Sequence, residues 1–346
     1  MTAPSFSEVF AELTRPEGIS PASVRRVFDA VLRGDWTPVQ VAGFAVALRL
    51  TGESAEIIAA AAGSLRDAMV PVEHGLEKVL DTCGTGGDSA GTLNLSTGAA
   101  ILAAASGVPV AKHGNRAVSS RAGSADVLEA LGVPTDLPAS AGQHLLQRLG
   151  IAFLMAPTHH PAMRHGGVAR RELGIRTIFN CLGPLANPAR ATHQLLGAYD
   201  DALRPVLART LGTLGVERAW VVRGEDGLDE LSPHAPTRVS VLEHGRVTEL
   251  TVHPSDFGLE ESPAGAIAGG DAADNARAIE QVLSDAPHPA LDAFVLNAAA
   301  ALVVALELEP RAATDRIRET LATGRARALL ERWRRETGEL RDGRAG

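Results

Sequence analysis

Cysteine is scarce in this sequence, and its scarcity excludes two ways of stabilising a fold. Only Cys83 and Cys181 occur among the 346 residues. They are too few and too far apart for a disulfide framework or a four-ligand zinc site. No H-E-x-x-H motif is present, so His159, His160 and His165 do not fit the usual zinc-binding helix. With 45% hydrophobic and 21% charged residues, the chain has enough apolar sequence for an ordinary core in one or two domains.

Long hydrophobic runs and an excess of basic residues are also absent. The longest uncharged apolar run, residues 293–306, is shorter than the roughly 20 residues that a membrane-spanning helix needs, so we expect a buried helix and no membrane partner. The net charge of −8 argues against general nucleic-acid binding. The first residues, MTAPSFSEVFAELTRPEG, lack the pattern of a secretory signal, which predicts a cytoplasmic protein.

Two hydrophobic patterns divide the chain. Residues 1–74 carry helical spacing only, with Thr37-Pro38 as a typical helix start and a further helix over 54–69. One helical face would be formed by Val24, Val27, Phe28, Val31 and Leu32. From about residue 75, short apolar runs alternate with helical stretches, which predicts an α/β domain with a mainly parallel sheet flanked by helices. These runs are residues 78–82, 107–111, 151–155, 194–198 and 218–222. Two alternating runs in 238–252 predict a hairpin at a sheet edge, turning at Glu243-His244-Gly245.

Two loops have a composition suited to an anion. Residues 83–98 follow the first predicted strand and residues 112–123 follow the second, and each leads into a helix. Ligands of open α/β sheets bind at the carboxyl ends of the strands, where these loops lie. Glycine-rich backbone and hydroxyl groups at a helix N-terminus favour negative charge. Ser124 is positioned to cap the second of these helices.

These loops also allow two other interpretations. The run from Gly84 to Ser89 begins like a dinucleotide-binding fingerprint but has serine at the last glycine position, and no P-loop motif occurs. The loops could also be simple tight turns, although a turn does not need so many polar side chains. Those side chains are Asp88, Asn94, Ser96, Lys112 and Asn115.

A basic cluster and an acidic cluster follow. The basic cluster comprises Arg164, Arg170, Arg171 and Arg176. We expect three of these arginines to be solvated and one to bind a carboxylate through its planar fork. Residues 223–232 carry four carboxylates, which could form an acidic surface turn or bind Mg²⁺ together with substrate phosphates.

Together these motifs resemble the anthranilate phosphoribosyltransferase family of tryptophan biosynthesis. The similar segments, in order, are residues 81–100, 112–132, 153–165, 172–189, 224–232 and 268–276. The similarity runs from the N-terminal helices to about residue 305. It implies a small helical domain, residues 1–74, completed by about 162–190. It also implies an α/β phosphoribosyl-binding domain formed by residues 75–161 and 191–346.

The resemblance implies a glycosyltransferase reaction with Mg²⁺. The phosphoribosyl group of phosphoribosyl pyrophosphate passes to the amino group of anthranilate, giving N-(5-phosphoribosyl)anthranilate and pyrophosphate. Two Mg²⁺ ions bound with the diphosphate and a homodimer formed through the helical domain are implied as well. No residue is assigned as nucleophile or general base.

The resemblance also assigns residues to three sites. The phosphoribosyl pyrophosphate site comprises Gly84, Gly87, Asp88, Thr92, Asn94, Leu95, Ser96, Thr97, Lys112, Asn115, Ser119, Ser120 and Ser124. The anthranilate site comprises Gly84, Asn115 and Arg170, and the metal ligands are Ser96, Asp229 and Glu230. The chain departs from the family pattern at two places. Family members commonly have histidine where this chain has Arg223, and they commonly have a proline before the Val-Arg pair where this chain has Gly166-Gly167-Val168-Ala169.

Two competing functions share this architecture. A pyrimidine-type nucleoside phosphorylase would use inorganic phosphate and a nucleoside, and would leave the acidic pair without an obvious role. A nonenzymatic nucleic-acid-binding relative would need a basic exposed face, which the net charge of −8 disfavours.

Overall fold

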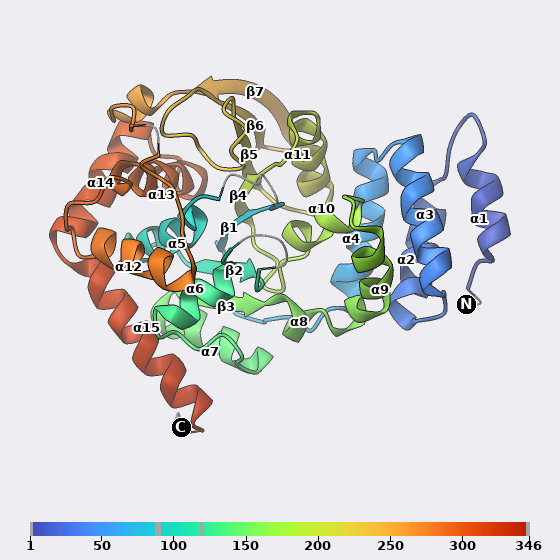
Figure 1. Cartoon of the computed structure of the whole chain (residues 1–346), viewed down its shortest axis with the longest axis horizontal. Helices are drawn as coiled ribbons and strands as arrows, with labels where there is room; N and C mark the ends of the chain where they lie inside the picture. Colours follow the sequence, from blue (N-terminus) through green and yellow to red (C-terminus); the bar gives the residue numbers. More distant parts are fainter. Residues whose placement is uncertain (1–2, 87–90, 118–120, 264, 344–346) are drawn as a thin grey trace.

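The computed structural model describes residues 3–86, 91–117, 121–263 and 265–343 (Figure 1). Of the predicted site residues, Gly87, Asp88, Ser119 and Ser120 lie outside this part of the chain. Helices near the N-terminus form one end of the molecule, and the sheet with its covering helices forms the other (Figure 1).

Four helices form the N-terminal bundle. They are α1 (Phe6–Leu13), α2 (Pro21–Arg33), α3 (Pro38–Thr51) and α4 (Ala55–Ala68). Each begins after a serine or threonine whose hydroxyl accepts a backbone N–H of the first turn, which satisfies a donor that the helix itself cannot pair. The predicted start at Thr37-Pro38 is confirmed. So is the predicted face of α2, since its five apolar residues are buried.

Two later helices pack onto this bundle. They are α9 (Arg164–Leu173), which lies against α2 and α3, and α10 (Phe179–Leu185), which lies against α4 (Figure 1). Phe179 contacts Phe28 with 5.3 Å between ring centroids. One apolar cluster contains Phe44 of α3, Ala169 of α9 and Leu182 of α10, so segments far apart in sequence share a core.

A seven-stranded sheet forms the centre of the α/β domain, with the order β3-β2-β1-β4-β5-β6-β7. The parallel strands are β1 (Leu80–Gly84), β2 (Val110–Gly114), β3 (Ile151–Met155), β4 (His193–Gly197) and β5 (Arg218–Gly224). The antiparallel strands are β6 (Thr237–Glu243) and β7 (Arg246–Val252), which form the predicted hairpin at the sheet edge. The predicted fold class is therefore confirmed, although β1 and β2 begin later in the sequence than the apolar runs suggested.

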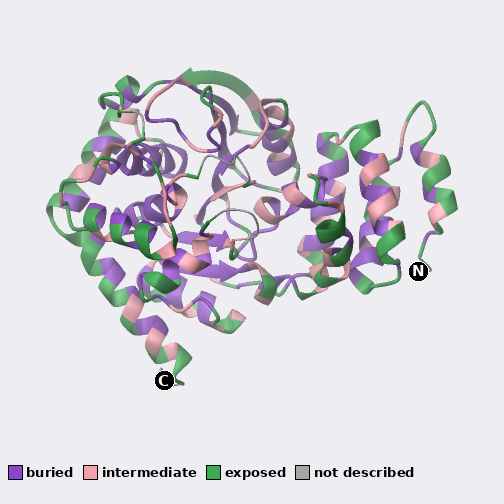
Figure 2. Cartoon of the chain, in the orientation of Figure 1, coloured by how far each residue is buried: buried purple, intermediate pink, exposed green. Residues whose placement is uncertain are grey.

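Helices cover both faces of this sheet. They are α5 (Leu95–Ala105), α6 (Ser124–Ala130), α7 (Ala139–Leu149), α8 (Ala156–His159), α11 (Arg204–Thr213), α12 (Ala272–Leu283), α13 (Leu291–Leu306), α14 (Pro310–Ala322) and α15 (Arg325–Arg341). Residues 293–305 of α13 are all buried, as predicted for the apolar run (Figure 2). No single helix in the described ranges is long and apolar enough to cross a membrane.

Candidate active site

The first anion loop joins β1 to α5 at the carboxyl end of the sheet. Helix α5 begins at Leu95, earlier than the sequence suggested, so Ser96 and Thr97 lie in its first turn. The four N-terminal N–H groups of a helix lack partners within it, and they lie at the positive end of the helix dipole. Asn94, Leu95, Ser96 and Thr97 therefore lie where negative charge is stabilised.

The acidic segment after β5 reaches this loop. The backbone N–H of Gly86 donates to Asp229 Oδ2 at 3.1 Å, and that of Ser96 donates to Glu230 Oε1 at 3.1 Å. Neighbouring side chains on an extended strand point to opposite faces, so both can reach one loop only if the segment bends. A turn closed by the N–H of Gly227 on the carbonyl of Gly224 supplies that bend, with Gly227 at φ 94°. The acidic segment therefore bends directly after β5.

Two glycines make room for the acidic segment. A Cβ on Gly197, at the end of β4, would lie 1.6 Å from the carbonyl oxygen of Asp229. A Cβ on Gly84, at the end of β1, would lie 2.7 Å from Asp229 Oδ2. Both distances are too short for any other residue at these positions without displacement. The end of β4 therefore admits the backbone of Asp229 only because Gly197 carries no side chain, whereas a side chain at Gly84 would require the Asp229 carboxylate to turn aside.

Lys112 of β2 reaches the first turn of α5 from the interior of the domain. Its side chain is buried, and Nζ donates to Thr82 O at 2.5 Å and to Ser96 Oγ at 3.3 Å. On the neighbouring strand the Asp81 carboxylate is fully buried and accepts the backbone N–H of His113 at 3.1 Å. Burial raises the pKa of Asp81 to about 6, and burial lowers the pKa of Lys112, an effect that the Asp81 carboxylate opposes. Lys112 thus contacts the predicted metal ligand Ser96 from the interior of the domain.

A chain of two amides links the first loop to the second. Asn94 Nδ2 donates to Ala122 O at 3.2 Å, and Asn94 Oδ1 accepts from Asn275 Nδ2 at 2.8 Å. Asn275 Oδ1 in turn accepts the N–H of Gly270 at 2.8 Å. The side chain of Asn94 therefore connects the two loops to the segment 268–276, while Thr92 pairs with Ala268 of the same segment. The sequence pattern marks this segment but indicates no role for Asn275.

The second loop differs from the prediction at its helix start. The N-cap of α6 is Gly123 and Ser124 is the first helical residue, so the predicted Ser124 cap is wrong. The Ser124 hydroxyl instead donates to Asn115 O at 3.3 Å. Asp126, the third residue of the helix, accepts the N–H groups of Ala117 and of the N-cap Gly123, each at 2.9 Å, which is the acidic half of a capping box.

The four arginines of the basic cluster have different surroundings. Arg170 lies on α9 with its guanidinium 5.9 Å from the centroid of the Phe179 ring, and it forms no ion pair with the described residues. Arg170 is itself exposed, as are Arg164 and Arg171. Arg176, expected to be solvated, is instead half-buried and stacks over the Tyr199 ring at 3.8 Å from its centroid. Of the four, Arg170 and Arg176 are thus placed against aromatic rings.

Two buried histidines lie close together, His113 in β2 and His160 at the end of α8. The rings of His113 and His160 are 5.1 Å apart, and His113 Nδ1 is 3.0 Å from Gly183 O. Burial lowers the pKa of His113 to about 3 and that of His160 to about 4, so both rings are neutral at physiological pH. No group of three or more histidine, cysteine, aspartate or glutamate side chains placed to hold a metal ion occurs among the described residues. The zinc alternative therefore gains no support there.

Cys83 lies at the same edge of the sheet, and its thiol is not activated. Gln194 Nε2 donates to its sulfur at 3.2 Å. Burial, reinforced by the Asp81 carboxylate, raises the pKa of the thiol well above its usual range.

Replacing Cys83 with serine should therefore retain most of the activity, because a protonated thiol is not a nucleophile and Ser Oγ can accept the same hydrogen bond from Gln194. Steady-state kcat and KM measurements check this. Loss of activity in a variant with an unchanged circular dichroism spectrum would instead require a covalent role for the thiol.

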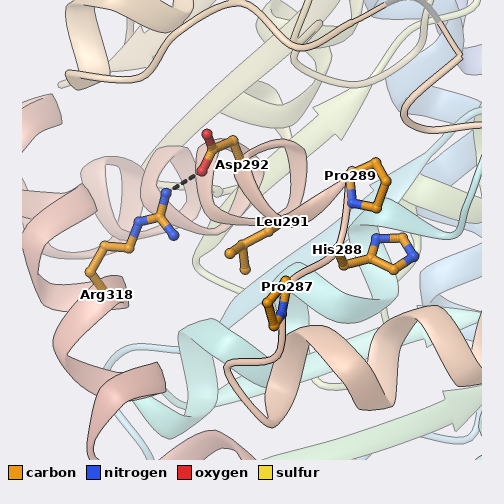
Figure 3. Close-up of a pocket in the computed structure, with 6 residues that line it drawn as sticks. All are labelled: Pro287, His288, Pro289, Leu291, Asp292 and Arg318. Atoms are coloured by element: carbon orange, nitrogen blue, oxygen red, sulfur yellow. Dashed lines mark hydrogen bonds and ion pairs between the residues drawn. The ribbon is translucent and has the colours of Figure 1, made fainter.

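A separate hollow lies away from these loops. Its volume is about 490 Å³, and it lies beside the start of α13, where Arg318 of α14 forms an ion pair with Asp292 (Figure 3). The lining residues are Pro287, His288, Pro289, Leu291, Asp292 and Arg318. None of the predicted site residues is among them.

Comparisons with known proteins agree with this arrangement. Two family models match: "Glycosyl transferase family, helical bundle domain" over residues 7–69 and "Glycosyl transferase family, a/b domain" over residues 76–327. The anthranilate phosphoribosyltransferase of Symbiobacterium thermophilum is 45% identical over 95% of this chain and 97% of its own length. That of Methylobacterium radiotolerans is 46% identical over 99% of both chains.

Solved structures give the same result. The anthranilate phosphoribosyltransferase of Thermus thermophilus is 42% identical, with a TM-score of 0.87 over 92% of this chain and 96% of that one. The Saccharomyces cerevisiae enzyme in complex with PRPP and Mg is 29% identical, with a TM-score of 0.88 over 96% of this chain and 98% of that one. With both domains matched and curated relatives aligned over almost its whole length, the chain belongs to the anthranilate phosphoribosyltransferase family.

Proposed function

We propose that the acidic segment and the first anion loop form the site where this chain transfers the phosphoribosyl group of phosphoribosyl pyrophosphate to anthranilate, in tryptophan biosynthesis. The observation that carries the proposal is the convergence of Asp229 and Glu230 on the backbone N–H groups of Gly86 and Ser96. It brings oxygen ligands for a cation to a helix N-terminus suited to phosphate. A substrate that is both a polyanion and a metal ligand fits this combination.

Phosphoribosyl pyrophosphate would be bound by residues of both loops. In the described part of the chain they are Gly84, Thr92, Asn94, Leu95, Ser96, Thr97, Lys112, Asn115 and Ser124; Gly87, Asp88, Ser119 and Ser120, which lie outside it, complete the proposed set. Backbone N–H groups in the first turn of α5 would bind phosphate oxygens. Asn94 would act mainly by holding the two loops together, since both ends of its amide are already hydrogen-bonded.

The side chains at this point also fit Mg²⁺. Ser96 Oγ and the carboxylates of Asp229 and Glu230 are hard oxygen ligands, which Mg²⁺ prefers. Among the described residues they form no complete cluster, in keeping with an ion that takes one or two carboxylates and completes its shell with substrate phosphates and water. When bound, Mg²⁺ would neutralise negative charge on the departing pyrophosphate, and two ions would bind with each diphosphate.

The protein's own contribution is positioning and electrostatic stabilisation. The N-terminus of α5 would stabilise the charge that develops on the leaving group. Arg170 would bind the anthranilate carboxylate through its fork, and Gly84 and Asn115 would leave space for the aromatic amine in line with C1 of the ribose. No nucleophile is needed, which agrees with the protonated state of Cys83.

A fluorescence assay tests the function. Purified protein mixed with anthranilate, phosphoribosyl pyrophosphate and Mg²⁺ should consume anthranilate, seen as a loss of its fluorescence. A parallel reaction with inorganic phosphate and a pyrimidine nucleoside tests the phosphorylase alternative. Turnover only in the second reaction would overturn the proposal.

Replacing Arg170 with alanine should raise the KM for anthranilate much more than the KM for phosphoribosyl pyrophosphate. The substitution removes a charge-assisted contact to one substrate only, worth about 1.5–3 kcal/mol. The exposed neighbour Arg171, changed to alanine, is the matched control. Equal effects of Arg170→Ala on both substrates, or a larger anthranilate defect in Arg171→Ala, would reject the assignment.

A homodimer formed through the helical domain is also proposed, in a cytoplasmic protein. On α3, Val39 is 81% exposed and Leu50 is 82% exposed. Phe10 of the neighbouring α1 is 48% exposed. Exposed large apolar side chains on neighbouring helices are typical of a surface that a second protomer covers.

Changing both Val39 and Leu50 to glutamate should therefore shift the protein from dimer to monomer, because paired charges would face each other across the interface. Light scattering coupled to gel filtration measures the molar mass. A wild-type protein that elutes as a 36.0 kDa monomer would refute the dimer.

A further inference from the structure

Asn297 interrupts an otherwise apolar helix. In the buried stretch 293–305 of α13, all residues except Asn297 are Ala, Val, Leu or Phe. Asn297 is fully buried there. A buried amide is costly unless its donors and acceptor are paired, and a leucine would suit this helix better on propensity and on burial. The asparagine therefore needs a partner that an apolar residue could not satisfy.

The partner is the backbone of Leu231, the residue that follows the acidic pair. Asn297 Oδ1 accepts the N–H of Leu231 at 2.9 Å. Asn297 Nδ2 donates to Leu231 O at 3.1 Å and to Ala293 O, one turn back in the helix, at 3.0 Å. The amide thus pairs with both polar groups of Leu231, as a neighbouring strand would, and leaves none of its own polar atoms unpaired.

This contact holds the acidic segment from the side opposite the substrate loop. Residues 225–236, all within the described part of the chain, form no regular strand, so the sheet ladder does not fix their backbone. Towards the loop, the carboxylates of Asp229 and Glu230 accept N–H groups of Gly86 and Ser96. Towards the core, Asn297 binds the backbone N–H and C=O of Leu231, the residue after Glu230. The segment is therefore clamped between α5 and α13.

We propose that Asn297 is a positioning residue of the Mg²⁺ site, acting on Asp229 and Glu230 through the backbone of Leu231. The inference rests on the metal role proposed for the acidic pair. Mg²⁺ requires near-ideal octahedral geometry at short distances, so a small displacement of its carboxylates weakens binding. Without the amide, the N–H and C=O of Leu231 lose their partners inside the core, and the backbone beside Glu230 must shift to find others.

Two substitutions and one control test the proposal. Asn297→Asp keeps an acceptor for the Leu231 N–H but loses the amide donors, and Asn297→Leu loses all three contacts. The control is Val304→Ala, two turns further along the same helix and equally buried, which creates a cavity without touching Leu231. The Asn297→Asp variant, which has the same shape and keeps one of the three contacts, keeps the test available if Asn297→Leu does not fold.

Three measurements are compared across these variants. In metal-free protein, amide exchange of Leu231 should be faster by about tenfold or more in Asn297→Leu, because its N–H loses its acceptor, and should change less in Asn297→Asp, which keeps one. The Mg²⁺ concentration for half-maximal rate should rise by about tenfold, the factor expected for losing contacts of this kind. Calorimetric titration of Mg²⁺ into protein with pyrophosphate should show the same loss of affinity. Val304→Ala should lower the thermal midpoint while leaving the Mg²⁺ requirement and the exchange of Leu231 near wild-type values.

The outcomes separate this inference from the proposal beneath it. If the Asn297 variants bind Mg²⁺ normally while an Asp229→Asn, Glu230→Gln variant does not, Asn297 has no positioning role and the metal role of the pair stands. If the pair variant also shows a normal Mg²⁺ requirement, both proposals fall. A Val304→Ala variant with the same Mg²⁺ defect as Asn297→Asp would likewise overturn the inference, because any loosening of α13 would then suffice.

Discussion

Gly197→Ala should remove most of the activity, although it adds only one methyl group. The new Cβ would lie 1.6 Å from the carbonyl oxygen of Asp229, and both atoms belong to backbone segments that cannot simply rotate away. Relieving the contact requires the acidic segment or the end of β4 to move by roughly 1 Å or more, and a misplacement of that size can cost on the order of 100-fold in rate. We expect a loss of about that size in kcat/KM, with a higher Mg²⁺ requirement.

The control for this variant is Gly338→Ala in α15. A Cβ there meets nothing within 4 Å, and alanine is the better helix former, so stability should be unchanged or slightly higher. Kinetics and thermal unfolding of the two variants are compared side by side. A Gly197→Ala enzyme with wild-type kcat/KM would mean that the acidic segment can shift without consequence, and that its contact with the loop does not matter for catalysis.

The double substitution Asp229→Asn, Glu230→Gln should impair the use of phosphoribosyl pyrophosphate and raise the Mg²⁺ concentration needed for half-maximal rate. Amide oxygens can still accept the N–H groups of Gly86 and Ser96, so the thermal midpoint of the substrate-free protein should change little. The loss should therefore appear in Mg²⁺ binding measured with pyrophosphate present. Without pyrophosphate, wild-type protein should bind little Mg²⁺, because the substrate supplies much of the coordination.

Glu225→Gln is the matched control for the acidic pair. Glu225 lies in the same segment but pairs with Arg238 on the surface, and exposed pairs contribute little to stability. The control variant should keep a normal Mg²⁺ requirement. A defect of similar size in both variants would show that general negative charge, and not the placement of Asp229 and Glu230, is what the segment supplies.

The sequence predicted the sheet well because a strand buried on both faces is a short apolar run. The runs at 151–155 and 218–222 match β3 and β5 closely. Boundaries were weaker where hydroxyl residues begin a helix, as at Ser96, since threonine and serine favour loops and helix starts alike. The predicted cap at Ser124 was wrong because the helix already includes Ser124, whose hydroxyl donates to Asn115 O instead of accepting an N–H of the first turn.

The residues that position the site were the least predictable. Asn297 is a single polar residue in an apolar stretch and Asn275 is one of several polar residues of α12, and periodicity gives no indication of what either amide contacts. Gly197 carries no signal at all, because the oxygen that would collide with its side chain comes from Asp229, far later in the chain. Lys112 was predicted as part of a loop, whereas it belongs to β2 and its ammonium lies inside the domain. Such facts depend on contacts between distant segments.

The packing of α9 and α10 against the first four helices has a consequence for how the chain folds as it is synthesised. Helices α1 to α4 are complete at Ala68, but the ring of Phe179 that covers Phe28 comes much later. At about 5–20 residues per second, the ribosome needs roughly 5–20 s to pass from residue 69 to residue 163 before α9 begins. Helices form in about a microsecond, so α1 to α4 can form long before α9 and α10 are synthesised. Until then, part of their apolar surface remains exposed to solvent. The nascent chain is therefore most exposed to aggregation, and most in need of a chaperone, during the synthesis of the first three strands of the sheet.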